Sequence, residues 1–176
     1  LPVSWLAEWV EIDATPDQMA EALTRRGFYV EGVEDFGHAY PGVVVARVLE
    51  VASHPNADRL SLCRVDSGQG ERRVVCGAPN VRAGMIVPLA TIGARLPSGV
   101  TIKASKIRGE ESEGMLCSAR ELELSEDHEG ILDLARFLAP AEPPALGTPL
   151  DRVLEPPDRV LEIEIPFNRP DGLGIV

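Results

Sequence analysis

Six short apolar stretches separated by turn-forming residues occupy residues 41–133, and they constrain the fold more than any other feature of the sequence. They read GVVVARVLEV, LSLCRVD, ERRVVCG, MIVPLATI, GVTIKASKI and GMLCS. Glycine, proline, asparagine or serine lies between them, and DSGQGE supplies a tight hairpin connection. Short strands at such close intervals are typical of a small closed or nearly closed β-barrel. We therefore expect a mainly β chain of the α+β class.

A small α/β unit is predicted before the barrel, over residues 1–40. Thr15 is a suitable N-cap for a helix, with Pro16 at its first position, and Gly27 follows the helix end. SWLAEW indicates a helical turn, and FYVEGVED indicates a strand. The barrel is then expected over residues 41–150.

Residues 151–176 are predicted to contain a strand that leads out of the barrel. The stretch LAPAEPPALGTP before it is rich in proline and alanine, which is typical of a linker with polyproline character. In VLEIEIPF, apolar and acidic residues alternate, as in a half-buried strand. We expect this strand to belong to a sheet of a larger chain.

Charge is distributed unevenly along the sequence. The formal net charge is -11, yet residues 47–120 carry 11 basic and 7 acidic side chains between two acidic ends. Such asymmetry indicates either a partner of opposite charge for the middle segment or acidic ends that are simply solvated. No apolar stretch resembles a membrane span or a signal peptide, so we expect a cytoplasmic protein without a membrane partner.

Catalytic and metal-binding motifs are not evident. His38, His54 and His128 are far apart and form no His-x-x-x-His pattern, and no two cysteines form a Cys-x-x-Cys pair. The cysteines, expected to be buried and structural, are Cys63, Cys76 and Cys117. We therefore expect no catalytic residue, metal or cofactor in this part of the chain.

The stretch HPNAD, residues 54–58, is interpreted as a turn between two barrel strands. Pro55 fixes the bend, and Asn56 or Asp58 would cap backbone amides. A hydrogen bond of His54 within the turn is favoured over a ligand role. Arg59 would point outward.

Five stretches resemble a known family. HPNADRLSLCRVDSG, ERRVVCGAPNVRAG, GARLPSG, SKIRGEESEGMLCSARELEL and EDHEGILDL are similar, in this order and spacing, to the tRNA-binding module first named for an endothelial-monocyte-activating polypeptide. VSWLAEWV and VLEIEIPFNRPDG extend the resemblance to the N-terminal region of bacterial phenylalanyl-tRNA synthetase β subunits. Glu123 departs from the pattern, because that family usually has glycine there.

The resemblance implies a five-stranded oligonucleotide-binding (OB) barrel that binds tRNA. It also implies a parent enzyme that attaches phenylalanine to tRNA with ATP and magnesium, in an α2β2 heterotetramer with an α subunit. Alternatives are a free-standing tRNA-binding module or chaperone, and a domain that serves only as a spacer or interaction surface.

RNA recognition by this barrel cannot rely on exposed aromatic rings, because residues 41–136 contain no Phe, Tyr or Trp. Phosphate contacts and polar side chains are expected instead. The candidate RNA-binding residues are Asn56, Arg59, Arg64, Arg72, Arg73, Asn80, Lys103, Lys106, Arg108 and Ser112.

Overall fold

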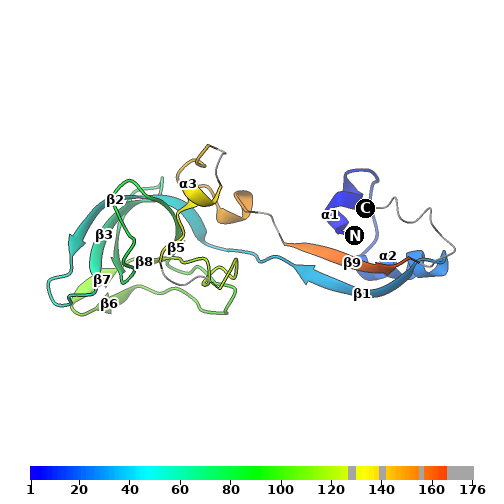
Figure 1. Cartoon of the computed structure of the whole chain (residues 1–176), viewed down its shortest axis with the longest axis horizontal. Helices are drawn as coiled ribbons and strands as arrows, with labels where there is room; N and C mark the ends of the chain where they lie inside the picture. The colour runs from blue at the N-terminus through cyan, green and yellow to red at the C-terminus, as the bar shows by residue number, and fades with distance from the viewer. Residues whose placement is uncertain (127–129, 139–141, 155–156, 166–176) are drawn as a thin grey trace. The chain divides into compact units, whose positions relative to one another are not determined.

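The computed structural model describes residues 1–126, 130–138, 142–154 and 157–165, which divide into two compact units (Figure 1). The first unit combines residues 1–37 with the segment that begins at residue 156. The second unit comprises residues 38–155 and contains the barrel. The barrel sequence is therefore inserted between two segments that pack together in the first unit.

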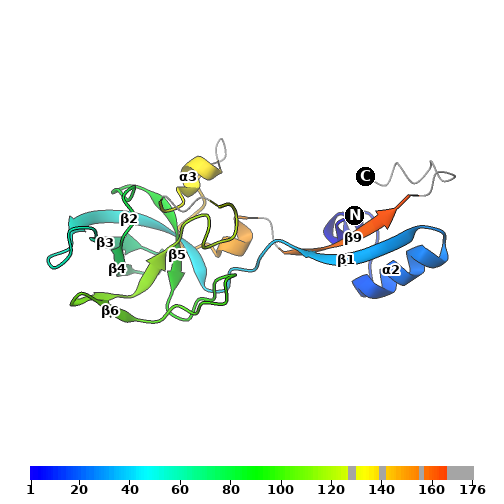
Figure 2. The same ribbon diagram turned by 60° about the horizontal axis from the view of Figure 1, so that its bottom comes forward.

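The second unit is built on a five-stranded antiparallel sheet in the order β4-β3-β2-β5-β8, as expected for an OB-like barrel. Its strands are β2 (Val43–Ser53), β3 (Ser61–Asp66), β4 (Glu71–Cys76), β5 (Ile86–Thr91) and β8 (Gly114–Leu116). The long strand β2 pairs with β5 through its first half and with β3 through its second half. A bulge between Val48 and Glu50 lies within the β3-paired half, and Figure 2 shows the resulting curvature.

A separate hairpin, β6 (Ser105–Ile107) with β7 (Glu110–Ser112), lies beside the sheet. The predicted strand GVTIKASKI is longer than the observed one, because β6 contains just its last three residues. Arg108 and Gly109 form its turn with φ of 52° and 101°. Positive φ at both central positions matches the twist of a two-residue hairpin.

The barrel closes where the free edge of β4 meets residues 112 and 113. The Glu113 amide donates a hydrogen bond to the Arg73 carbonyl (2.8 Å), and the Arg73 amide donates to the Glu113 carboxylate (3.0 Å). The Val75 amide donates to Ser112 Oγ (3.1 Å). These bonds satisfy an edge that would otherwise present unpaired backbone groups.

Two clusters of buried apolar side chains fill the second unit. One includes Leu122 and Leu134, and the other includes Val65, Val74 and Leu89. Tyr40 joins the first cluster and donates its hydroxyl to the Leu122 carbonyl (3.0 Å). Burial raises the pKa of the Tyr40 hydroxyl, and the nearby acidic groups of Asp151 and Glu123 raise it further.

The stretch ARELEL forms a hydrogen-bonded turn. The Leu124 amide donates to the Ala119 carbonyl (2.9 Å), which closes the turn. Glu123 has φ 53°, in the left-handed region that favours glycine. This conformation gives a physical reason for the glycine that the resembled family has there.

The described part of the proline-rich stretch is packed on the barrel, which corrects the expected linker. The Val45 amide donates to the Thr148 carbonyl (2.9 Å), and the Gly147 amide donates to the Val45 carbonyl (2.8 Å). Leu146 packs against the apolar cluster that contains Leu150. The apolar side chains within the stretch explain the difference, because burying them favours docking over a solvated linker.

The first unit contains α1 (Val3–Ala7), α2 (Pro16–Arg25), β1 (Tyr29–Phe36) and β9 (Asp158–Glu164). Helix α2 begins as predicted: Thr15 Oγ1 accepts a hydrogen bond from the Gln18 amide (3.3 Å), and Gln18 Oε1 accepts one from the Thr15 amide (2.9 Å). This reciprocal pair is a capping box.

The C-terminal strand β9 pairs with β1 of this chain, in an antiparallel ladder from Tyr29 opposite Glu164 to Phe36 opposite Asp158. We expected this strand to join a sheet of a larger chain. That expectation is wrong for the edge of β9 that pairs with β1. Alternation alone indicates that a strand has one buried face, but it carries no information about the partner strand.

The turn between β3 and β4 provides a test of barrel packing. Gly68 (φ 76°) lies against residue 146, where an added Cβ would meet the Leu146 carbonyl oxygen at 2.5 Å. Gly99 (φ 81°) has a similar backbone but open space around it. We expect Gly99→Ala to lower the free energy of unfolding by about 1 kcal/mol through φ alone. Gly68→Ala should lower it by about 2–4 kcal/mol, because steric overlap is added.

Urea unfolding followed by circular dichroism measures both variants. Equal losses for the two would contradict the close packing of the β3–β4 turn on residues 146 and 147.

Candidate nucleic-acid interface

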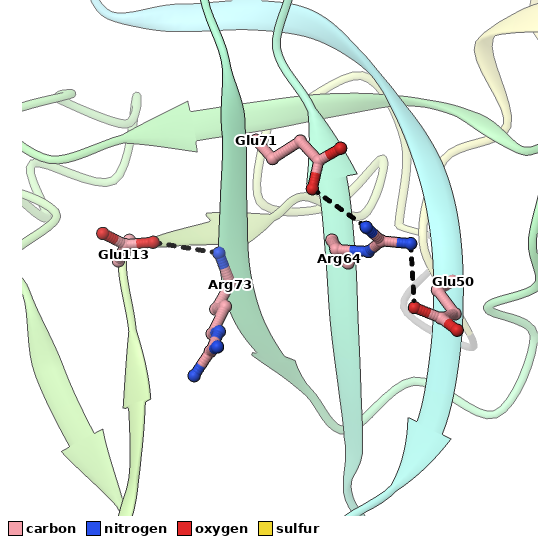
Figure 3. A network of polar contacts seen from close by, with 5 residues as sticks. All are labelled: Glu50, Arg64, Glu71, Arg73 and Glu113. Atoms are coloured by element: carbon pink, nitrogen blue, oxygen red, sulfur yellow. Dashed lines mark hydrogen bonds and ion pairs between the residues drawn. The ribbon is translucent and has the colours of Figure 1, made fainter.

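Two arginines lie directly opposite each other on the outer face of the sheet, Arg64 on β3 and Arg73 on β4 (Figure 3). Like charges in this arrangement repel. Arg64 is held by two carboxylates: its guanidinium contacts Glu50 at 3.0 Å and Glu71 at 3.1 Å. The charge of Arg64 is therefore neutralised within the fold.

Arg73 differs from its neighbour although both are exposed. Its backbone amide is bonded to Glu113, but within the described residues its guanidinium has no ion pair. Both arginines line a cleft of about 250 Å³, whose lining also includes Glu50, Glu110 and Glu111. Arg73 thus carries an available positive charge, whereas Arg64 does not.

Arg72, the third candidate on these strands, pairs with Val65 in the ladder and is half-buried. Its Nε is buried and has no hydrogen-bond partner among the described residues.

The HPNAD stretch forms the predicted turn and also holds the β6–β7 hairpin. His54, which is 5% exposed, accepts a hydrogen bond at Nδ1 from the Asn56 amide (3.1 Å). Its Nε2 lies 3.1 Å from the Ile107 carbonyl, so Nε2 carries the proton and donates. Asn56 Nδ2 donates to the Arg108 carbonyl (3.0 Å). We call these three bonds the His54–Asn56 clamp.

The clamp corrects the expected role of Asn56 in capping amides, because its side chain donates to a carbonyl across the fold. It also fixes the turn at Arg108, a residue with positive φ, because the Arg108 carbonyl accepts one of the three hydrogen bonds. The clamp therefore determines where the hairpin presents its cations.

Four further candidate cations are exposed: Arg59, Lys103, Lys106 and Arg108. Lys106 lies opposite Glu111 in the β6–β7 ladder, but no ion pair joins the two. Lys106 and Arg108 come from the same short hairpin, one on its strand and one in its turn.

Asn80 and Ser112 have their polar groups engaged within the fold. Asn80 donates through Nδ2 to the Ile131 carbonyl (2.9 Å) and accepts at Oδ1 from the Ile131 amide (2.8 Å). Ser112 is 3% exposed, and besides accepting from Val75 it donates to the Gly114 carbonyl (3.0 Å). These bonds tie loops and strands together, and the RNA contact expected of both residues stays a prediction.

The carboxylates that neutralise Arg64 were not anticipated. Glu50 and Glu71 lie on neighbouring strands, and their proximity to Arg64 follows from the ladder register. Once the strands are aligned, Glu50 falls directly opposite Arg64. Composition alone carries no such signal.

All three cysteines are free and buried, as expected. A hydrogen bond between Cys63 and Cys76 raises the pKa of the Cys63 thiol, which burial raises further, and lowers the pKa of the Cys76 thiol. Burial raises the pKa of Cys117 to about 12.

Within the described ranges, no three His, Cys, Asp or Glu side chains are grouped so that they could hold a metal ion. His128 lies outside those ranges. Over the same ranges, none of the helices has the length and apolar character that crossing a membrane requires.

Comparison with known proteins gives one family. Residues 43–143 match the family described as "Putative tRNA binding domain". A phenylalanine–tRNA ligase beta subunit of Syntrophus aciditrophicus is 48% identical over 172 residues, which is 98% of this chain and 21% of that protein. The corresponding subunit of Anaeromyxobacter dehalogenans is 49% identical over 177 residues, or 100% and 21%.

The chain thus spans about a fifth of the length of these relatives. Among solved structures, a MetRS-related protein from Pyrococcus horikoshii is 24% identical, with a TM-score of 0.41, and the match covers 60% of this chain and 85% of that one.

The His54–Asn56 clamp generates a prediction from two conservative variants. In His54→Asn, Oδ1 replaces Nδ1 as acceptor from the Asn56 amide, but the bond to the Ile107 carbonyl is lost. In His54→Gln, the side-chain amide replaces Nε2 as donor to Ile107, and the turn bond is lost. Each variant should lower the free energy of unfolding by about 1–3 kcal/mol.

Amide hydrogen exchange separates the two variants. We expect faster exchange across Ser105–Ile107 and Glu110–Ser112 in His54→Asn, and near-native exchange there in His54→Gln. Equal exchange in both variants would mean that the Ile107 bond does not hold the hairpin.

Proposed function

The chain belongs to the tRNA-binding domain family that residues 43–143 match, and from this premise we propose that its barrel binds tRNA through exposed cations on β4 and the β6–β7 hairpin. Within residues 41–150, the proposed phosphate contacts are Arg73, Lys106 and Arg108, with Arg59 and Lys103 beside them. Arg64 and Arg72 make weaker contributions, and Asn56, Asn80 and Ser112 support the fold around the cations.

The observation that carries this proposal is the difference between neutralised and available cations. Arg64 has two carboxylate partners, whereas Arg73, Lys106 and Arg108 have no ion pair within the described residues. Phosphate binding gains free energy when a cation releases the counterions condensed on RNA. A cation already paired with carboxylates must first give up those partners.

We further propose that the chain is part of a phenylalanine–tRNA ligase β subunit. Support comes from relatives of that name that are 48% and 49% identical over 98% and 100% of this chain. The parent enzyme would attach phenylalanine to tRNA in the cytoplasm with ATP and Mg²⁺, as an α2β2 assembly with an α subunit. In this proposal the present segment contributes RNA binding, while ATP and Mg²⁺ are held elsewhere in the parent.

The first test is titration of residues 1–176 with tRNA at several salt concentrations. We expect a Kd no tighter than about micromolar at physiological salt, because the whole chain carries a formal net charge of -11. The double variant Lys106→Ala/Arg108→Ala should make the slope of log K against log salt shallower by about 1.4–1.8 units.

Glu111→Gln is the control on the same hairpin, since it changes charge without removing a cation. An unchanged slope in the double variant, with an unchanged thermal midpoint, would remove Lys106 and Arg108 from the interface. Absence of tRNA binding even at low salt would favour a spacer role for the barrel.

Arg73 and Arg64 form a matched pair for a second test. Arg73→Ala should make the salt slope shallower by about 0.7–0.9 units. Arg64→Ala should change it by less than half as much, because Glu50 and Glu71 already act as the counterions of Arg64. Stability should show the opposite order: Arg64→Ala loses about 0.5–1 kcal/mol from exposed ion pairs. Equal slopes for the two variants would contradict the distinction between paired and available cations.

A further inference from the structure

A cavity of about 510 Å³ lies between the end of β4, the segment that leads into β6, and the strands β7 and β8. Its apolar lining includes Ile102, Ile107, Met115 and Ile131. A cavity of this size that combines apolar walls with polar groups fits the usual form of a small-ligand site. Of the cations proposed above to contact phosphate, Lys103 alone lines this cavity.

One carboxylate in this cavity is only partly engaged. Glu121 Oε2 accepts hydrogen bonds from the Ser118 amide (2.7 Å) and from Ser118 Oγ (2.8 Å). Its Oε1 has no hydrogen-bond partner within the described residues. Ser118 therefore fixes the carboxylate and leaves one acceptor for a ligand. Lys103 and Ser105 also line the cavity, and both are exposed.

Three sequence stretches through which the chain resembles its family border this cavity. Residues 75–79 come from ERRVVCGAPNVRAG, and residues 105–121 contribute from SKIRGEESEGMLCSARELEL. Gly130 and Ile131 come from EDHEGILDL. Stretches that are far apart in the sequence thus meet around one cavity. The fold and the proposed phosphate contacts account for only part of the residues in these stretches.

We propose that this cavity receives one unpaired nucleobase of the bound RNA, a proposal that rests on the function proposed above. Residues 41–136, which include every strand of the sheet and the β6–β7 hairpin, contain no Phe, Tyr or Trp, and the exposed ring of Phe137 does not line the cavity. Aliphatic walls are therefore the means by which this cavity could shield a base from water. Ile102, Ile107 and Met115 would contact the faces of the base. Lys103 at the opening would meet the adjoining phosphate.

The free acceptor of Glu121 determines which bases fit. A carboxylate accepts from an exocyclic amino group such as N4 of cytosine. Uracil presents a carbonyl oxygen at the corresponding position, which would face the carboxylate without a hydrogen atom between them. The cavity should therefore prefer cytosine to uracil.

The test is a methyl NMR titration of residues 1–176 with cytidine 5′-monophosphate and with uridine 5′-monophosphate. Cytidine monophosphate should shift the methyl signals of Ile102, Ile107, Met115 and Ile131, and it should bind about tenfold more tightly than uridine monophosphate. Short oligo(C) and oligo(U) strands should show the same order, and a fully paired RNA duplex should leave these methyl signals unchanged.

Glu121→Gln converts the free acceptor into a donor while it keeps one oxygen for Ser118. The cytosine preference should fall to less than threefold or invert in favour of uracil. Glu111→Gln removes the same charge outside the cavity and should leave the preference unchanged. If Glu121→Gln lowers the thermal midpoint so far that it cannot be titrated, Lys103→Ala serves instead, and it should weaken the monophosphate more than the free nucleoside.

The outcomes separate this inference from the proposed function. If tRNA binds with the expected salt slope but neither nucleotide shifts the cavity methyl signals, the base site is wrong and the phosphate interface stands. If cytidine monophosphate enters the cavity but no RNA binds, the cavity serves free nucleotides, and both the base site and the tRNA function are overturned.

Discussion

The barrel depends on how the free edge of β4 is satisfied. A curved sheet of five strands ends at β4 and β8, and the backbone groups on the outer side of β4 need partners. Ser112 and Glu113 supply them through one side-chain hydroxyl, one carboxylate and one backbone amide. Ser112 is the last residue of β7, and Glu113 connects β7 to β8. The bonds that close the barrel therefore also hold the β6–β7 hairpin in place. Ser112 lines the cavity that contains Glu121.

Acidic side chains shape the proposed interface as much as basic ones. Glu50 and Glu71 form ion pairs with Arg64. The Glu113 carboxylate accepts a hydrogen bond from the backbone amide of Arg73, and the Arg73 guanidinium is left exposed. An acidic chain can thus bind a polyanion when a few cations are kept away from internal carboxylates. Affinity then depends on which cations remain unpaired, and the count of basic residues overestimates it.

The sequence was most informative where local chemistry determines structure. The capping box at Thr15, the barrel strands and the turn at HPNAD all follow from residue patterns over a few positions. Predictions were weaker where partners are distant in sequence: β9 with β1, residues 146–149 with β2, and Asn56 with Arg108. Glu50 and Glu71 likewise reach Arg64 through strand register, which a list of charged residues does not contain.

The ladder between β1 and β9 joins segments separated by more than a hundred residues. In an unfolded chain, bringing such distant ends together costs conformational entropy that grows with the logarithm of the loop length. A barrel that has already folded shortens this loop, because its sequence lies between Phe36 and Asp158, which pair with each other. The topology therefore favours a route in which the inserted domain forms before the two-stranded ladder, because the ladder then closes a shorter loop.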